Sequence, residues 1–304
     1  MSTPVASPAA WVAVFVLILV QLLFGALSVA GKFALAAFPP LGLAALRVVV
    51  SGILLVIIER IWVRERVAPR HLALLALYSL FGVVGNQVLF ISGLARTEAV
   101  PATVLVTTIP VWTLLVAVVL GVERPGWRKY AGVTLALVGV AIMVGVTAAA
   151  FRLDVALGNL MVTLNALSYA IYLVIARRLL REYDALTVAA WTFLFGSLVI
   201  VPLGLPDLVG LDWGAVPASA WLALLYIILG GTVAAYALNN WALRHVASTT
   251  VAAYIYLQPI VATALAVTLL GERPTLRTLT GALFIFAGVW FAVVARKSGR
   301  VRIA

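Results

Sequence analysis

The sequence has no cysteine and few charged residues for its length. Cysteine is absent from all 304 residues, which excludes a disulfide framework and any metal site built from thiolates. Asp, Glu, Lys and Arg make up only 10% of the chain, whereas soluble domains contain roughly 25%. With 65% hydrophobic residues and a mean hydropathy of +1.18, the chain is not expected to fold as a soluble globule.

Ten stretches are long and apolar enough to cross a membrane, for which about 20 residues are needed. Hydrocarbon offers the backbone no hydrogen-bond partner, so each stretch should be a helix. The predicted fold class is therefore all-α integral membrane, with ten transmembrane helices. The predicted spans are 11–31, 42–59, 72–93, 100–121, 129–147, 156–176, 186–204, 219–240, 250–270 and 278–295.

The second half of the chain repeats the first at an offset of 149 residues. Between Pro110 and Val140 eleven residues recur at this offset, and the run Glu123-Arg124-Pro125 returns as Glu272-Arg273-Pro274. We predict two five-helix repeats, residues 1–150 and 151–304. Because five is odd, the second repeat must enter the membrane inverted relative to the first. Inverted repeats of this kind are common in secondary transporters, whose binding site lies near the midplane between the repeats.

Lys and Arg are distributed unevenly between the predicted loops. Fifteen of the 21 lie on one side and five on the other, while Arg47 falls within a span. Loops rich in Lys and Arg stay in the cytoplasm. This pattern predicts a multi-pass protein of the cell inner (plasma) membrane with both termini cytoplasmic. It also accounts for the net charge of +11 without a nucleic-acid partner.

Polar side chains inside predicted spans are costly in lipid and are therefore candidates for function. Adjacent amides occur in span three and again in span eight, where they would form a polar cavity wall or, alternatively, join helices through hydrogen bonds. Lys32 would recognise an anionic group, or its side chain would reach the membrane interface. The predicted substrate-binding residues are Lys32, Asn86, Gln87, Tyr169, Asn239, Asn240, Tyr256 and Gln258.

Other residues in the spans predict how the helices pack. Arg47, near the start of span two, should face Glu98 or the outer loops. Gln21 and Ser28 share a face of span one and either join helices or line the cavity.

Two kinds of small or rigid residue recur between the halves. Pro110 and Pro259 are repeat mates inside spans four and nine, where each should bend its helix. Glycines at seven-residue spacing in spans five and ten predict close helix packing; they are Gly132, Gly139, Gly281 and Gly288.

Several short motifs resemble those of one known family. They are Phe24-Gly25 and Lys32 in span one, Ala44-Ala45-Leu46-Arg47 at the start of span two, and Gly271-Glu272-Arg273-Pro274 after span nine. Over its whole length the chain resembles the EamA family of the drug/metabolite transporter superfamily, and within it bacterial amino acid and metabolite exporters, including the aromatic amino acid exporter branch. The first repeat departs from the motif, with Val122 where the second has Gly271. The resemblance implies a central cavity between spans one to four and six to nine, with spans five and ten peripheral.

We therefore expect a secondary transporter that exports amino acids or related small metabolites by alternating access, as a monomer or homodimer and without a cofactor. A sugar-phosphate or nucleotide-sugar transporter is the alternative, although only Lys32 and Arg47 would be available to bind phosphate. A membrane sensor without transport is the alternative of another class. An enzyme is disfavoured, because the sequence contains neither His-Glu-x-x-His nor Gly-x-Ser-x-Gly.

Lys32→Ala and Asn240→Ala are expected to reduce transport without reducing the amount of folded protein, because both side chains are predicted to contact the substrate. Uptake into proteoliposomes, compared with the yield of folded protein in detergent, checks this. Full activity in both variants would remove the cavity assignment.

Overall fold

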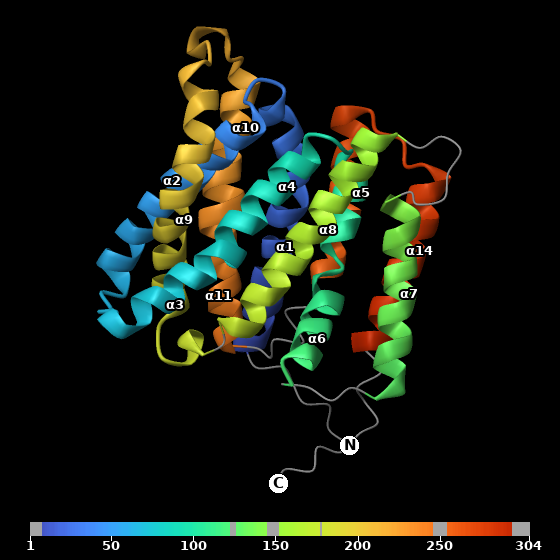
Figure 1. Ribbon diagram of the computed structural model, residues 1–304, viewed down its shortest axis with the longest axis horizontal. Coiled ribbons are helices and arrows are strands. Elements are labelled where there is room, and N and C mark those ends of the chain that lie inside the picture. Colours follow the sequence, from blue (N-terminus) through green and yellow to red (C-terminus); the bar gives the residue numbers. More distant parts are fainter. Residues whose placement is uncertain (1–7, 122–125, 145–151, 177, 246–253, 294–304) are drawn as a thin grey trace.

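The computed structural model describes residues 8–121, 126–144, 152–176, 178–245 and 254–293, and within these ranges the chain forms helices and no strands. In the described part of the chain, seven helices are long and apolar enough to cross a membrane, and three shorter apolar helices accompany them. The chain thus has the architecture of an all-helical, multi-pass membrane protein, drawn in Figure 1.

The first half of the chain contains two uninterrupted long helices followed by two broken ones. Its elements are α1 (Pro8–Leu35), α2 (Pro40–Trp62), α3 (Pro69–Ser79), the π-helical turn η1 (Leu80–Gly85), α4 (Asn86–Leu94), α5 (Ala99–Val106), α6 (Ile109–Val119) and α7 (Trp127–Val144).

The second half follows the same order. Its elements are α8 (Leu153–Ile175), the 3₁₀ turn η2 (Leu179–Arg181), α9 (Ala185–Val209), the 3₁₀ turn η3 (Trp213–Ala215), α10 (Ala218–Ile228), the π-helical turn η4 (Leu229–Ala234), α11 (Ala235–His245), the 3₁₀ turn η5 (Ile255–Leu257), α13 (Gln258–Leu265), the π-helical turn η6 (Ala266–Leu270) and α14 (Leu276–Val293).

Several element boundaries recur 149 residues apart, the offset of the sequence repeat. Helices α3 and α10 start and end at corresponding residues, and so do the π-helical turns η1 and η4 that follow them. Helices α7 and α14 also correspond from first to last residue, and α6 and α13 begin at corresponding residues. The two halves therefore correspond in the positions at which their helices are interrupted, as well as in sequence.

The two repeat-related prolines do not lie inside continuous helices, so the expectation of interior bends is wrong. Span four breaks between α5 and α6, and Pro110 occupies the first turn of α6. Pro259 occupies the first turn of α13, after the 3₁₀ turn η5. A proline is tolerated in the first turn because the amide hydrogen it lacks has no helical acceptor there.

Helix α1 lies inside the bundle and contacts elements of both halves, among them α5, α10, α11 and α13. Helices α2 and α9 pack along each other, as do α4 and α8. Helices α7 and α14 stand side by side at one edge, as Figure 1 shows.

Glycines bring α7 and α14 into close contact, as the sequence predicts. A Cβ on Gly139 would lie 2.7 Å from the carbonyl oxygen of Gly281, and a Cβ on Gly288 would lie 2.5 Å from that of Gly132. Gly139 and Gly288 are repeat mates, and so are Gly132 and Gly281. The two contacts therefore correspond to each other under the repeat. Each helix presents the corresponding glycine positions to the other, as the two subunits do in an isologous interface.

Gly288→Ala is expected to destabilise the protein, because the new methyl group would also lie 2.4 Å from the backbone nitrogen of Ala136. A clash with backbone should outweigh the gain of about 1 kcal/mol in helix propensity. The thermal unfolding midpoint in detergent measures the effect. The matched control is Gly126→Ala, whose Cβ would have no neighbour within 4 Å; equal midpoints in the two variants would contradict the packing argument.

Candidate substrate site

The amides of α4 lie at a contact between the two halves of the chain. The Asn165 side chain on α8 donates a hydrogen bond to the backbone carbonyl of Asn86, at 2.6 Å. The Gln87 side chain donates to the Asn86 side chain at 3.0 Å. Gln87 is buried, and its own side-chain oxygen has no hydrogen-bond partner within the described ranges. A buried acceptor without a donor is costly, so this oxygen is available to a ligand.

Aromatic side chains from four helices meet in the interior. Tyr169 and Tyr172 of α8 stack, with ring centroids 5.7 Å apart. Tyr236 of α11 makes edge-to-face contacts with Phe24 of α1 and Phe193 of α9. Tyr236 also lies within electrostatic range of both stacked tyrosines. All but Phe193 are only partly buried, and such rings suit contact with the apolar part of a small molecule.

Two polar residues of α1 join helices. The Gln258 side chain donates to that of Gln21 at 2.7 Å, and both are buried. The hydroxyls of Ser28 and Thr103 lie 2.6 Å apart in a buried hydrogen bond. Helix–helix hydrogen bonding, one of the two readings left open by the sequence, therefore describes these contacts.

The expected position of Arg47 is wrong. Its side chain is not directed to Glu98 or the outer loops but is 2% exposed inside the bundle. Its Nε donates to the hydroxyl of Thr232, at 3.0 Å, in the π-helical turn η4. The Thr232 hydroxyl in turn donates to the backbone carbonyl of Ile227 at 2.7 Å. Sequence reasoning missed Thr232, although the adjacent glycines Gly230-Gly231 could have marked an interruption of the helix there.

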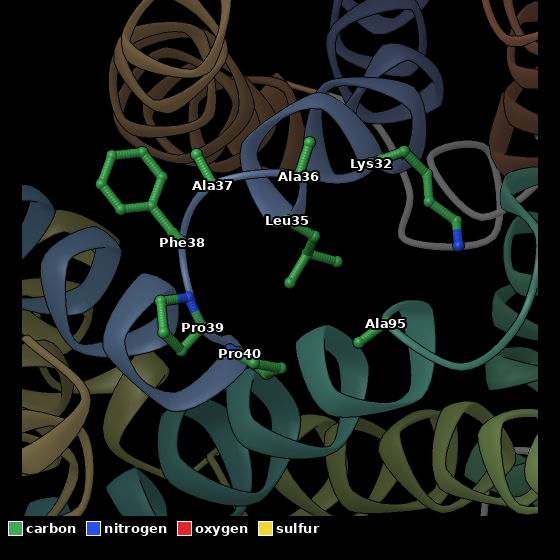
Figure 2. A pocket seen from close by; sticks show the side chains of 8 residues that line it. All are labelled: Lys32, Leu35, Ala36, Ala37, Phe38, Pro39, Pro40 and Ala95. Atoms are coloured by element: carbon green, nitrogen blue, oxygen red, sulfur yellow. The ribbon is translucent and has the colours of Figure 1, made fainter. Parts of the chain in front are cut away.

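Lys32 lies at the end of α1, beside a pocket of about 410 Å³. Figure 2 shows Leu35 in the middle of the view, between Lys32 and Ala95 on one side and Phe38 and Pro39 on the other. The residues lining the pocket are Lys32, Leu35, Ala36, Ala37, Phe38, Pro39, Pro40 and Ala95. The Lys32 ammonium lies within electrostatic range of Glu98 and Glu272. Lys32 is thus part of a charged group at one end of the bundle.

Glu272 joins the loop before α14 to the start of α5. Its carboxylate accepts hydrogen bonds from the backbone N–H groups of Ala99, at 2.7 Å, and Val100, at 3.1 Å. These N–H groups have no acceptor within their own helix, and the start of a helix favours negative charge. One of the two Glu-Arg-Pro sequences thereby ties span nine to span four.

The predicted site residues fall into separate groups. Asn86, Gln87 and Tyr169 lie on the facing helices α4 and α8. Asn239 is half-buried on α11. Gln258 contacts α1 through Gln21, and Lys32 lies at the end pocket. The side chains of Asn240 and Tyr256 lie outside the described part of the structure.

Comparison with known proteins yields one family and a set of transporters. The EamA-like transporter family matches residues 11–145 and again residues 156–294. An uncharacterized transporter of Archaeoglobus fulgidus is 31% identical over 72% of this chain and 74% of its own. A probable terminal-alkyne amino-acid exporter of Streptantibioticus cattleyicolor is 28% identical over 86% of each chain.

Two further matches are more distant. An S-adenosylmethionine uptake transporter of Rickettsia prowazekii is 24% identical over 67% of this chain and 66% of its own. A protein of known crystal structure has the same fold, with a TM-score of 0.65 at 19% identity, covering 96% of this chain and 99% of that one.

Glu98→Gln should flatten the pH dependence of stability. Partial desolvation, and secondarily Glu272, raises the pKa of the Glu98 carboxyl above its ordinary 4.5, although the residue stays exposed to solvent and Lys32 and Arg152 oppose the shift. A raised pKa means that the stability contributed by this group is fully present below its unfolded pKa and is lost as the pH rises through its folded pKa. We therefore expect the variant to gain stability relative to wild type at neutral pH.

Thermal unfolding midpoints in detergent, measured across a pH series from 4 to 8, check this expectation. Asp154→Asn removes a carboxylate that is 70% exposed and serves as the control, with no comparable change expected. A wild-type loss of stability with rising pH that persists in Glu98→Gln would contradict the assignment to Glu98.

Proposed function

Because the chain belongs to the EamA-like transporter family, we propose that it is a secondary transporter that exports amino acids or related small metabolites across the cell inner membrane by alternating access. The observation that carries the proposal is that polar and aromatic groups from both halves meet in the interior: Asn165 donates to the backbone of Asn86, and Tyr236 packs against Phe24. Polar groups at this depth are retained where a substrate passes.

The proposed scaffold has ten spans in two inverted repeats, residues 1–150 and 151–304. In the described ranges, seven helices long enough to span and three shorter apolar helices support this number of spans. Two observations support the repeats: the family matches once in each half, and element boundaries recur 149 residues apart. Inverted repeats allow one half to move against the other, so that a midplane site opens to each side in turn. The positive loops favour cytoplasmic termini.

The proposed substrate class follows from chemistry that two relatives share. One relative is named a probable terminal-alkyne amino-acid exporter, and the other an S-adenosylmethionine uptake transporter. Both kinds of molecule carry an α-amino and an α-carboxylate group. The amides of Asn86, Gln87 and Asn239 offer hydrogen bonds to such groups, and Tyr169 offers a ring to the remainder of the molecule.

The test is uptake into proteoliposomes of a panel of labelled amino acids, with sugar phosphates as controls. We expect saturable uptake of one group of amino acids, competed by its chemical relatives. Protein inserted in one known orientation gives the direction of transport. Exchange of sugar phosphates without amino acid uptake would overturn the proposed substrate class.

Asn239→Ala is expected to lower this uptake at least several-fold, because the side chain is half-buried in the proposed path. The control is Thr268→Ala, an exposed residue whose hydroxyl bonds only to backbone carbonyls of its own helix. Equal activity of the two variants would contradict the role of Asn239.

A further inference from the structure

Arg47 is buried without an anionic partner. Among the Lys and Arg residues whose side-chain burial the structure describes, it is the only one that is fully buried. It lies seven residues after Pro40, which is about 10 Å along the helix axis. The ion pairs found within the described ranges do not include it. A charge held this far from water normally requires an opposite charge or a ligand that supplies one.

The guanidinium retains hydrogen-bonding capacity. Its Nε is occupied by Thr232, and the described contacts assign no acceptor to the two terminal amino groups. These groups donate side by side, an arrangement that matches the two oxygens of a carboxylate. The bond to Thr232 holds the planar group in a defined orientation, because Thr232 is itself fixed to the carbonyl of Ile227.

A second polar group without a partner lies next to Arg47. Ser51 follows one helical turn later on α2, and residues so spaced have Cβ atoms about 5–6 Å apart. Its hydroxyl is fully buried and has no hydrogen-bond partner in the described structure. A free hydroxyl one turn from a free guanidinium edge is an arrangement that an oxyanion satisfies.

One of the rings described above lies near the guanidinium. Tyr236 is within electrostatic range of Arg47. Through Tyr236 the charge borders the contacts with Phe24 and Phe193. The surroundings thus combine one positive charge with partly buried apolar surface.

We propose that Arg47, with Ser51, binds the carboxylate of the transported molecule, while Tyr236 and its neighbouring rings contact the apolar part. One guanidinium matches the single negative charge of a carboxylate, whereas a phosphate ester carries nearly two charges and would call for more buried cations. This inference rests on the proposed transport of amino acids and assigns their carboxylate to a site that none of the eight sequence-predicted residues includes.

The test is ligand binding by the full-length protein in detergent, measured as ligand-dependent stabilisation against heating. The probes are L-phenylalanine, L-leucine and L-methionine, each compared with its carboxamide, and phenyl phosphate. We expect at least one amino acid to stabilise the wild type while its carboxamide, which lacks the carboxylate, binds at least tenfold more weakly.

Two variants distinguish recognition of the ligand's charge by Arg47 from a purely structural role of its contact with Thr232. Arg47→Gln keeps a donor near Thr232 but removes the charge, and should weaken amino acid binding at least tenfold while leaving carboxamide binding within about twofold. Thr232→Val breaks the bond between α2 and η4 but keeps the charge, and should weaken both ligands to the same extent. Partial recovery of amino acid binding in Arg47→Lys would support a role for the charge.

Several results would overturn the inference. Equal losses for amino acid and carboxamide in Arg47→Gln would make the residue a structural brace. Phenyl phosphate binding that exceeds carboxylate binding and depends on Arg47 would assign the site to another anion. If no amino acid stabilises the wild type, the carboxylate site fails as well. Saturable uptake of amino acids by the wild type in proteoliposomes would then still uphold the proposed function, because that assay detects transport whichever residues bind the substrate.

Discussion

The cost of a polar group away from water governs this structure more than any other constraint. Hydrocarbon offers no hydrogen bond, so each buried amide, hydroxyl or charge must find a partner inside the protein. Gln21 meets Gln258, Ser28 meets Thr103, and Asn165 meets the backbone of Asn86. These three contacts connect residues 75 or more positions apart, and two of them join the halves of the chain. Within the described ranges three buried side-chain atoms have no hydrogen-bond partner, on Ser51, Gln87 and Thr187. Ser51 lies one turn from Arg47 and Gln87 lies beside Asn86, so these two are the ones placed to meet a ligand.

The interruptions of the helices place side chains that a regular helix would direct elsewhere. The π-helical turns η1 and η4 occupy corresponding places in the two halves, and such turns are frequent at functional sites because they shift the side chains that follow. The turn η4 carries Thr232, which holds Arg47. The hydroxyl bond from Thr232 reaches five residues back to Ile227, the spacing of a π-helix. The π-helical backbone of η4 therefore fixes the position of Thr232, and through it the orientation of the buried Arg47 guanidinium.

Much of the scaffold could be predicted from the sequence, because apolar length and the repeat are local or additive signals. The predicted span 42–59 lies within α2, Pro40–Trp62, and the predicted close packing of spans five and ten is confirmed by Gly139 and Gly288. The site was less accessible to prediction. Arg47 meets a residue 185 positions away, and its helix-end position in the sequence suggested solvent or a nearby acid instead. Pro110 lies in the first turn of α6 rather than inside a continuous helix, and the helix is interrupted just before it, at Thr107 and Thr108. The roles predicted for Lys32 and the interior amides stay predictions.

The glycine contact between α7 and α14 has a consequence for motion. Gly139 contacts Gly281, and the repeat mate of Gly139, Gly288, contacts Gly132. If the two halves exchanged conformations, the contact between α7 and α14 would therefore keep the same form. Alternating access in an inverted-repeat protein is such an exchange. A symmetric contact of this kind does not have to break when the halves exchange conformations. We expect α7 and α14 to stay in contact while the remaining helices rotate about them. Their tight backbone packing would then set the axis of the movement, while the substrate determines only its timing.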